Sequence, residues 1–181
     1  MLFCLFMIPF VLQGAAFSLD EFVYHRRRGL PRWERIGHPI DTASILGPLF
    51  YVLNTDFSSR SLTIFAFMAL ASCLLVTKDE FVHAELCDAK EQWLHSVLFV
   101  LHPLLFVTVG TLWFLESIGA SPVPTFITFR TLIAGQAAFM SAVMVYQIIY
   151  WGFLWQSQSP QLTMKFTMSS VNDGIRPKTT L

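Results

Sequence analysis

Residues 79 to 102 hold the densest group of metal-ligating side chains in the chain. Three histidines stand there among carboxylates, between two strongly apolar runs. Side chains three or four residues apart share one face of a helix, so Glu80 lies with His83 and Glu91 lies with His95. Helical bundles hold two metal ions by supplying a carboxylate and an imidazole from each of several helices. This stretch therefore predicts part of a metal site.

Two similar pairs occur earlier in the chain. Glu21 precedes His25 by four residues, and Glu34 precedes His38 by four. Each pair again places a carboxylate and an imidazole on one helix face. We expect all four pairs to converge on a two-metal centre with these ligands: Glu21, His25, Glu34, His38, Glu80, His83, Glu91 and His95.

Further polar residues surround this set. His102 lies two turns beyond His95, roughly 10 Å along a helix, and is either a ligand or a hydrogen-bonded core histidine. Asp20, Asp79 and Asp41 would bridge metals or orient ligands from a second layer. Mixed carboxylate and imidazole ligation suits iron or manganese, and suits zinc less well because zinc needs only three or four ligands.

Composition places this set in a membrane protein. The chain has 181 residues, of which 54% are hydrophobic and only 13% charged, with a mean hydropathy of +0.56. The net charge is zero and the basic residues are dispersed, which excludes a nucleic-acid-binding face. The three cysteines have no paired spacing, so we expect no disulfide framework, and we treat Cys87 as structural.

The apolar runs predict an all-α bundle of about five transmembrane helices in a single domain, residues 1–156. The predicted spans are residues 2–19, 40–53, 62–77, 93–118 and 131–155. Pro31 would begin a short amphipathic segment, residues 32–38, ahead of a kinked second span that contains Gly47 and Pro48. Residues 157–181 read as a mobile polar tail.

Charge asymmetry predicts the orientation. Ten of the twelve lysines and arginines fall in the first loop, the third loop and the tail, and only Arg60 and Arg130 fall on the other side. The positive-inside rule then puts the amino terminus outside and the tail in the cytoplasm. We expect the membrane to be the inner membrane of a bacterium. All five histidines and nine of the twelve acids would meet at the cytoplasmic face.

A short repeat suggests that the first four spans are a duplicated helical hairpin. The residues at 20–23, Asp-Glu-Phe-Val, recur at 79–82, and Glu34 with His38 recurs as Glu91 with His95. Two such hairpins would be a parallel repeat about an axis along the membrane normal. The competing interpretation is a solvated collar of acids paired with the neighbouring arginines and lysines, which has no use for histidines at helical spacing.

The arrangement resembles, in outline, the ferritin-like di-iron carboxylate proteins, whose bundles use Glu-x-x-His. Only Glu80 with His83 has that spacing, and the other three pairs are Glu-x-x-x-His. The histidine boxes of membrane desaturases and the His-Glu-x-x-His string of zinc proteases are absent from the sequence. The resemblance implies that the helical bundle holds metal ions, and we carry no other property over from that family.

We therefore expect a membrane-embedded, non-haem di-metal oxidoreductase, with two iron ions that activate dioxygen toward a lipid-soluble substrate from the bilayer. One alternative is a non-catalytic metal-binding or assembly subunit that docks on a membrane protein partner through its fifth span. A haem b protein is the other, although haem needs facing histidines in apolar surroundings, and here only His102 lacks a nearby carboxylate.

Overall fold

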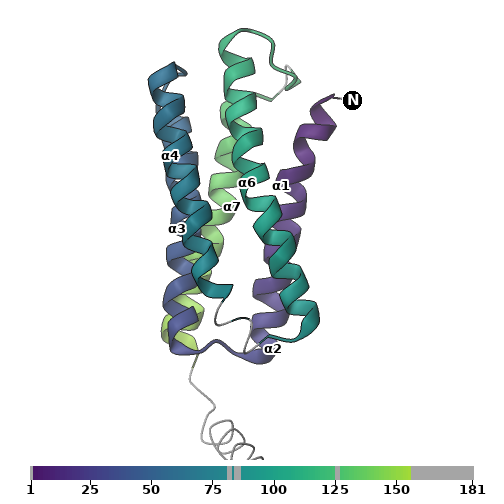
Figure 1. The fold of residues 1–181 in the computed structure, drawn as a ribbon, viewed down its shortest axis with the longest axis vertical. Helices are drawn as coiled ribbons and strands as arrows, with labels where there is room; N and C mark the ends of the chain where they lie inside the picture. The colour runs from purple at the N-terminus through teal and green to yellow at the C-terminus, as the bar shows by residue number, and fades with distance from the viewer. Residues whose placement is uncertain (1, 81–82, 84–86, 125–126, 156–181) are drawn as a thin grey trace, which may run out of the picture.

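The computed structural model describes residues 2–80, 83, 87–124 and 127–155, without the side chain of Asp79. The predicted all-α membrane bundle is confirmed, since every regular element among these residues is helical. Five long helices run alternately up and down the molecule (Figure 1). They are α1 (Leu2–Leu19), α3 (Arg32–Asn54), α4 (Ser59–Val76), α6 (Ala89–Ser117) and α7 (Phe129–Ile149). The predicted tail, residues 157–181, lies outside the described residues.

Within the described residues, four helical stretches are long and apolar enough to cross a membrane: Leu2–Arg28, Ser59–Val76, Ala89–Ser117 and Phe129–Leu154. Their outer faces expose large apolar side chains such as Phe67 (69% exposed) and Val107 (64% exposed), which suits contact with lipid. The fifth helix, α3, has 23 residues and would measure about 34 Å. It carries charged residues in its first half, which lowers its hydropathy.

One predicted boundary is wrong. The sequence indicates an amphipathic segment at 32–38 and a separate span at 40–53, but α3 is one continuous helix through Pro39 and Pro48. A proline removes one backbone donor, and packing against neighbouring helices lets a membrane helix tolerate that loss. Here α3 packs along α4 and α7, so both halves stay in one helix.

Local signals explain where the helices begin. Ser58 and Ser61 form a capping box at the start of α4, and the Asp88 carboxylate accepts hydrogen bonds from two backbone amides at the start of α6. Gly29 ends the first helix with φ of 77°. A side chain there would also meet Trp155, whose Cζ2 atom would lie 2.9 Å from an added Cβ, so only glycine fits this turn.

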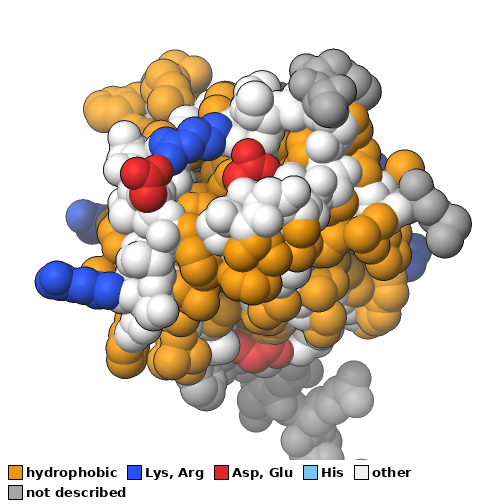
Figure 2. Space-filling view, turned by 90° about the horizontal axis from the view of Figure 1, so that it is seen from above, with side chains coloured by type: hydrophobic (Ala, Val, Ile, Leu, Met, Phe, Trp, Pro, Cys, Tyr) orange, Lys and Arg blue, Asp and Glu red, His pale blue; other side chains and the backbone are white. Residues whose placement is uncertain are grey.

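The two ends of the bundle differ in character. The end seen in Figure 2 is mostly hydrophobic with a few charged side chains. At the other end, the chain passes from α1 to α3 and from α4 to α6, so both of the ligand-rich connections meet there. In this arrangement α1 packs along α6, while α3 packs along α4. The up-and-down topology thus gathers the predicted ligands at one end.

Candidate metal centre

A π-helical turn shapes the first part of the site. Helix α1 continues through η1, a π-helix from Asp20 to His25, and then through α2 (Arg26–Arg28). In an α-helix, side chains five residues apart point about 140° away from each other. A π-helix forms its backbone hydrogen bonds between residues i and i+5, which brings these two residues closer to one face. The Asp20 Oδ2 atom consequently lies 3.4 Å from the His25 Nε2 atom. The π-helical segment therefore orients the Asp20 side chain toward the other ligand-type side chains.

Four histidines form the centre of this end of the bundle. Ring centroids are 4.5 Å apart for His25 and His38, and 3.9 Å apart for His83 and His95. The remaining neighbours are 6.1 Å apart for His25 and His95, and 6.4 Å apart for His38 and His83. These four imidazoles close a ring, which we call the histidine ring. His25, His83 and His95 are buried and His38 is half-buried.

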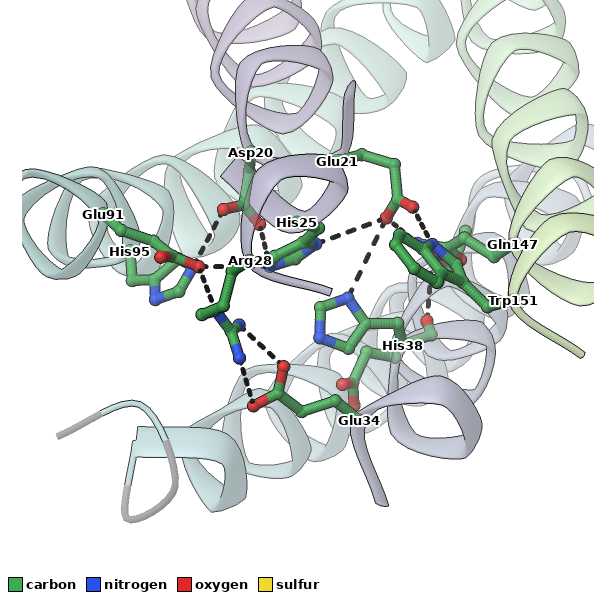
Figure 3. Close-up of polar contacts among 12 residues, drawn as sticks. Asp20, Glu21, His25, Arg28, Glu34, His38, Glu91, His95, Gln147 and Trp151 are labelled. Carbon is green, nitrogen blue, oxygen red and sulfur yellow. Dashed lines mark hydrogen bonds and ion pairs between the residues drawn. The ribbon is translucent and has the colours of Figure 1, made fainter. Parts of the chain in front are cut away.

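Each neighbouring pair in the histidine ring shares a further ligand-type side chain. Figure 3 shows Asp20 beside His25 and His95, and Glu21 beside His25 and His38. In each of the following groups, one ligand atom per residue lies within 4.8 Å of the others. The groups are Asp20, His25, Glu91 and His95; Glu21, His25 and His38; Glu34, His38 and His83; and His83, Cys87 and His95. Every ring histidine belongs to two groups, so the groups form one continuous cluster.

The distances within the histidine ring follow the predicted duplication, whereas the ring angles do not: they are 73° for His25 with His38 and 31° for His83 with His95. The short distance between His25 and His38 matches the short distance between His83 and His95, and the two long distances also match. A twofold axis through the ring would relate the distances in this way. The packing of α1 on α6 and of α3 on α4 follows the same axis. The repeated residues Phe81 and Val82 lie outside the described residues.

Several ring nitrogens are buried without a hydrogen bond. Among the residues that the structure describes, neither nitrogen of His25, nor His38 Nε2, nor His95 Nδ1 has a hydrogen-bond partner. The two His25 nitrogens lie 3.4 Å and 3.7 Å from oxygens of Asp20 and Glu21, which is ion-pair range without a hydrogen bond. A buried polar atom with no partner costs about 1–3 kcal/mol. Imidazole nitrogens are common ligands of iron, zinc, copper and nickel, and a metal ion would use these atoms. The donor set therefore fits a metal centre.

The balance of charge among the buried carboxylates also favours a metal centre. The carboxylates of Asp20, Glu21, Glu34 and Glu91 are all buried. Arg28 is the one lysine or arginine that pairs with them within the described part of the chain: it lies 2.8 Å from Glu34 and 3.1 Å from Glu91. The imidazoles are the other possible cations, since His25 lies 3.4 Å and His95 lies 2.9 Å from Asp20. With neutral imidazoles, four carboxylates against one guanidinium leave a negative excess, and uncompensated buried charge is costly. Metal cations would offset it.

The same region also contains ion pairs of the kind that the charged-collar interpretation predicts. Arg28 bridges Glu34 of one hairpin to Glu91 of the other, and Lys78 lies 2.6 Å from Asp41. These ion pairs are what a collar would contain. A collar does not account for the four clustered imidazoles, because an arginine pair needs no histidine beside it.

The sequence interpretation missed two residues that hold Glu21. Trp151 Nε1 donates a hydrogen bond to Glu21 Oε1, and Gln147 Nε2 donates one of 2.9 Å to Glu21 Oε2. The Gln147 amide oxygen in turn accepts a 2.9 Å hydrogen bond from Thr42. Trp151 lies in η3 (Tyr150–Leu154), a second π-helix at this end, and is fully buried. A glutamine inside an apolar span is the signal that would have found this contact.

Some predicted residues lie outside the four groups. Glu80 is half-buried and joins none of them, and the side chain of Asp79 is not described. Asp41 pairs with Lys78. His102 is buried with its Nε2 atom 3.0 Å from the Ser72 hydroxyl, which is the core-histidine arrangement.

Cys87 joins one group, with His83 and His95. Burial raises the pKa of its thiol to about 12. A bound metal ion lowers the pKa of a coordinating thiol, so Cys87 stays a ligand-type side chain of this group beside its predicted structural role.

A cavity of about 90 Å³ adjoins the histidine ring. It lies between the α1–α6 pair and the α3–α4 pair and is only partly enclosed. Its lining is Gln13, Phe17, Asp20, His38, Asp41, Ile45, Val76, His83, His95, Leu98, Phe99 and His102. The cavity joins ligand-type side chains at one end to apolar walls deeper in the bundle.

Comparison with known proteins finds no family model, no curated protein and no solved structure that matches this chain.

Proposed function

We propose that this end of the bundle binds two transition-metal ions in a non-haem centre. The closed histidine ring carries the proposal, because each neighbouring pair of imidazoles has a carboxylate or thiol within ligand distance. Mixed nitrogen and oxygen ligation favours iron, with manganese or zinc as the other fits. The buried negative excess of the four carboxylates gives the ions their charge partner.

We further propose that the centre is a di-iron oxidoreductase. Reduced iron supplies electrons for dioxygen chemistry when bound. The cavity beside the histidine ring supports a lipid-soluble substrate, since apolar side chains such as Ile45 and Phe99 line it. Trp151 and Gln147 would hold Glu21 in one orientation, as outer hydrogen bonds hold ligating carboxylates in other metal sites.

A non-catalytic metal-binding or assembly subunit is the second candidate. Two exposed apolar side chains at the end of the last helix, Phe153 (78% exposed) and Leu154 (65% exposed), favour it as a docking point for another membrane protein. A subunit of this kind would hold metal with every coordination position filled, whereas an oxidoreductase needs an open one.

Metal analysis and an absorption spectrum of the purified protein test the first proposal. We expect close to two ions per chain and no intense Soret band, because the histidines are surrounded by carboxylates. After anaerobic reduction, the iron-loaded protein should consume dioxygen if it is an oxidoreductase and stay inert if it only binds. An intense Soret band without other transition metals would instead establish a haem protein.

We also propose that the site faces the cytoplasm. Seven lysines and arginines lie at the site end of the helices, and Arg60 and Arg130 lie toward the other end. Reporter fusions should read as cytoplasmic after Arg28 and as external after Ser59 and after Val123. The opposite pattern would put the histidine ring outside.

A further inference from the structure

The ligand groups of the histidine ring differ in their chemistry. Each of the two short imidazole pairs shares one further ligand-type side chain, whereas carboxylates alone accompany the two long pairs. The groups at the short pairs are Glu21 with His25 and His38, and Cys87 with His83 and His95. Two ions bound at the short pairs would therefore have unlike surroundings, with a carboxylate at one ion and a thiol at the other.

Backbone structure places Cys87 beside its imidazole pair. The Cys87 amide nitrogen donates a 2.9 Å hydrogen bond to the His83 carbonyl oxygen, the bond of one helical turn, and residues four apart in such a turn share one face. His95 reaches the same place from α6. Its Nε2 atom bonds Asp20, and its buried Nδ1 atom has no hydrogen-bond partner within the described residues. Because buried polar atoms in proteins are nearly always bonded, this nitrogen points to a ligand of the site.

The predicted duplication shows what the thiol replaces. Glu80 is the counterpart of Glu21 in the second hairpin, but it is half-buried and joins none of the ligand groups. Arg28 stands at the position that corresponds to Cys87, so the first hairpin has no thiol there. One half of the centre thus has a carboxylate as its third ligand-type side chain, and the other half has a sulfur.

We propose that Cys87 binds one of the two metal ions as a thiolate, together with His83 and His95, so that the two ion positions are chemically different. The assignment rests on the proposed two-metal centre. Binding replaces the thiol proton by the metal ion, and the proton leaves to solvent. Iron accepts thiolate as well as carboxylate ligands, so both positions can hold iron, but the softer sulfur makes the second position the one that also accepts soft ions.

The surroundings of Cys87 act on its thiol in opposite directions. Burial raises the pKa of the thiol, and the neighbouring Glu91 raises it further, whereas the guanidinium of Arg28 lowers it. A metal ion adds a larger positive charge beside the sulfur than Arg28 does, and a coordinating thiol loses its proton outright. Thiolate formation is therefore expected to accompany metal binding.

Cobalt titration of the metal-stripped full chain in detergent, without dioxygen, tests the proposal. A thiolate bound to cobalt(II) gives an intense near-ultraviolet charge-transfer band, which carboxylate and imidazole ligands do not give. One cobalt ion per chain should produce this band in the natural protein, and a second should bind without adding to it. Cadmium, a soft ion, should displace the cobalt that produces the band. Two bound cobalt ions without the band would overturn the proposal.

Substitutions of the three cysteines identify the sulfur responsible. Cys87→Ser should abolish the band and weaken the binding of one cobalt ion by at least about 10- to 100-fold, the cost of losing an outer partner of a ligand. The other ion should stay bound, which shows that the variant folds. Cys4→Ser and Cys73→Ser are the matched controls, because neither cysteine belongs to a ligand group among the described residues. A band that survives in Cys87→Ser, or disappears in either control, would contradict the assignment.

The opposite half of the centre provides a reciprocal test. Glu21→Gln should weaken the binding of the second cobalt ion and leave the charge-transfer band in place, so loss of the band in this variant would contradict two separate positions. A protein that shows the band but consumes no dioxygen in its iron form would refute the proposed oxidoreductase alone. One that binds two iron ions and consumes dioxygen, but gives no band with cobalt, would refute this inference alone.

Discussion

Changing His95 to alanine should remove most of the bound metal while leaving the protein in the membrane. His95 belongs to two of the four ligand groups, and its Nε2 atom lies 2.9 Å from Asp20. Loss of an outer-layer partner already costs about 10- to 100-fold in metal affinity, so loss of a direct ligand should cost at least that much. Metal content after competition with a chelator measures the effect.

The predicted duplication extends this prediction to a second residue. His38 occupies the matching position in the other hairpin and also belongs to two groups, so His38→Ala should lose metal to a similar degree. Two controls bracket the result. Trp33→Leu changes an exposed aromatic beside Glu34, and His102→Asn changes a buried histidine outside the groups. Both should keep their metal, and full occupancy in both alanine variants would leave only the charged collar.

Replacing Arg28 by methionine should destabilise the metal-free protein by about 3 kcal/mol. Its guanidinium lies between two buried carboxylates, Glu34 and Glu91, and removing one partner of a buried ion pair costs about 3–5 kcal/mol. We take the low end because 17% of the Arg28 side chain is exposed. Thermal unfolding in detergent, with metal removed by a chelator, measures the loss.

Metal should restore much of this stability. Cations bound in the ring would face the same carboxylates and supply the charge that the variant lacks, so added metal should stabilise Arg28→Met more than it stabilises the natural protein. The neighbouring Arg27 is exposed, and Arg27→Met should change stability by less than about 0.5 kcal/mol. An equal response to metal in Arg28→Met and the natural protein would mean that the ions do not neutralise Glu34 and Glu91.

The two effects bear on different parts of the proposal. Loss of metal in the histidine variants concerns the donor atoms, whereas the response of Arg28→Met concerns the charge of the cluster. A protein with metal bound elsewhere would pass neither test. A protein that holds metal in the ring through histidines alone would pass the first and fail the second.

The amino-acid sequence by itself determined the membrane bundle and the end at which the site lies. Apolar runs of membrane-spanning length predict helices, since a backbone in lipid must satisfy its own hydrogen bonds. Short connections then force alternate direction on successive helices. Both ligand-rich connections must therefore meet at one end, and the spacing of Glu34 with His38 and of Glu91 with His95 puts each pair on one helix face.

Only the tertiary structure decided which ligand-type side chains meet. Helical spacing pairs residues within one helix, as it does Glu91 with His95, but the groups of the ring combine different helices, and His95 also meets Asp20. The π turn at Asp20–His25 has no sequence signature, although it moves Asp20 from the second layer into the cluster. A register based on 3.6 residues per turn cannot anticipate that change.

The contacts of the last helix depended on the fold in the same way. Trp151 stands in an aromatic cluster that reads as a membrane-interface belt or a docking surface, yet it is buried and donates its hydrogen bond to Glu21. Its role follows from the packing of α7 against α3, which no local pattern specifies. Distance in sequence hides such contacts, because Glu21 and Trp151 become neighbours only when the first and last helices share one end of the bundle.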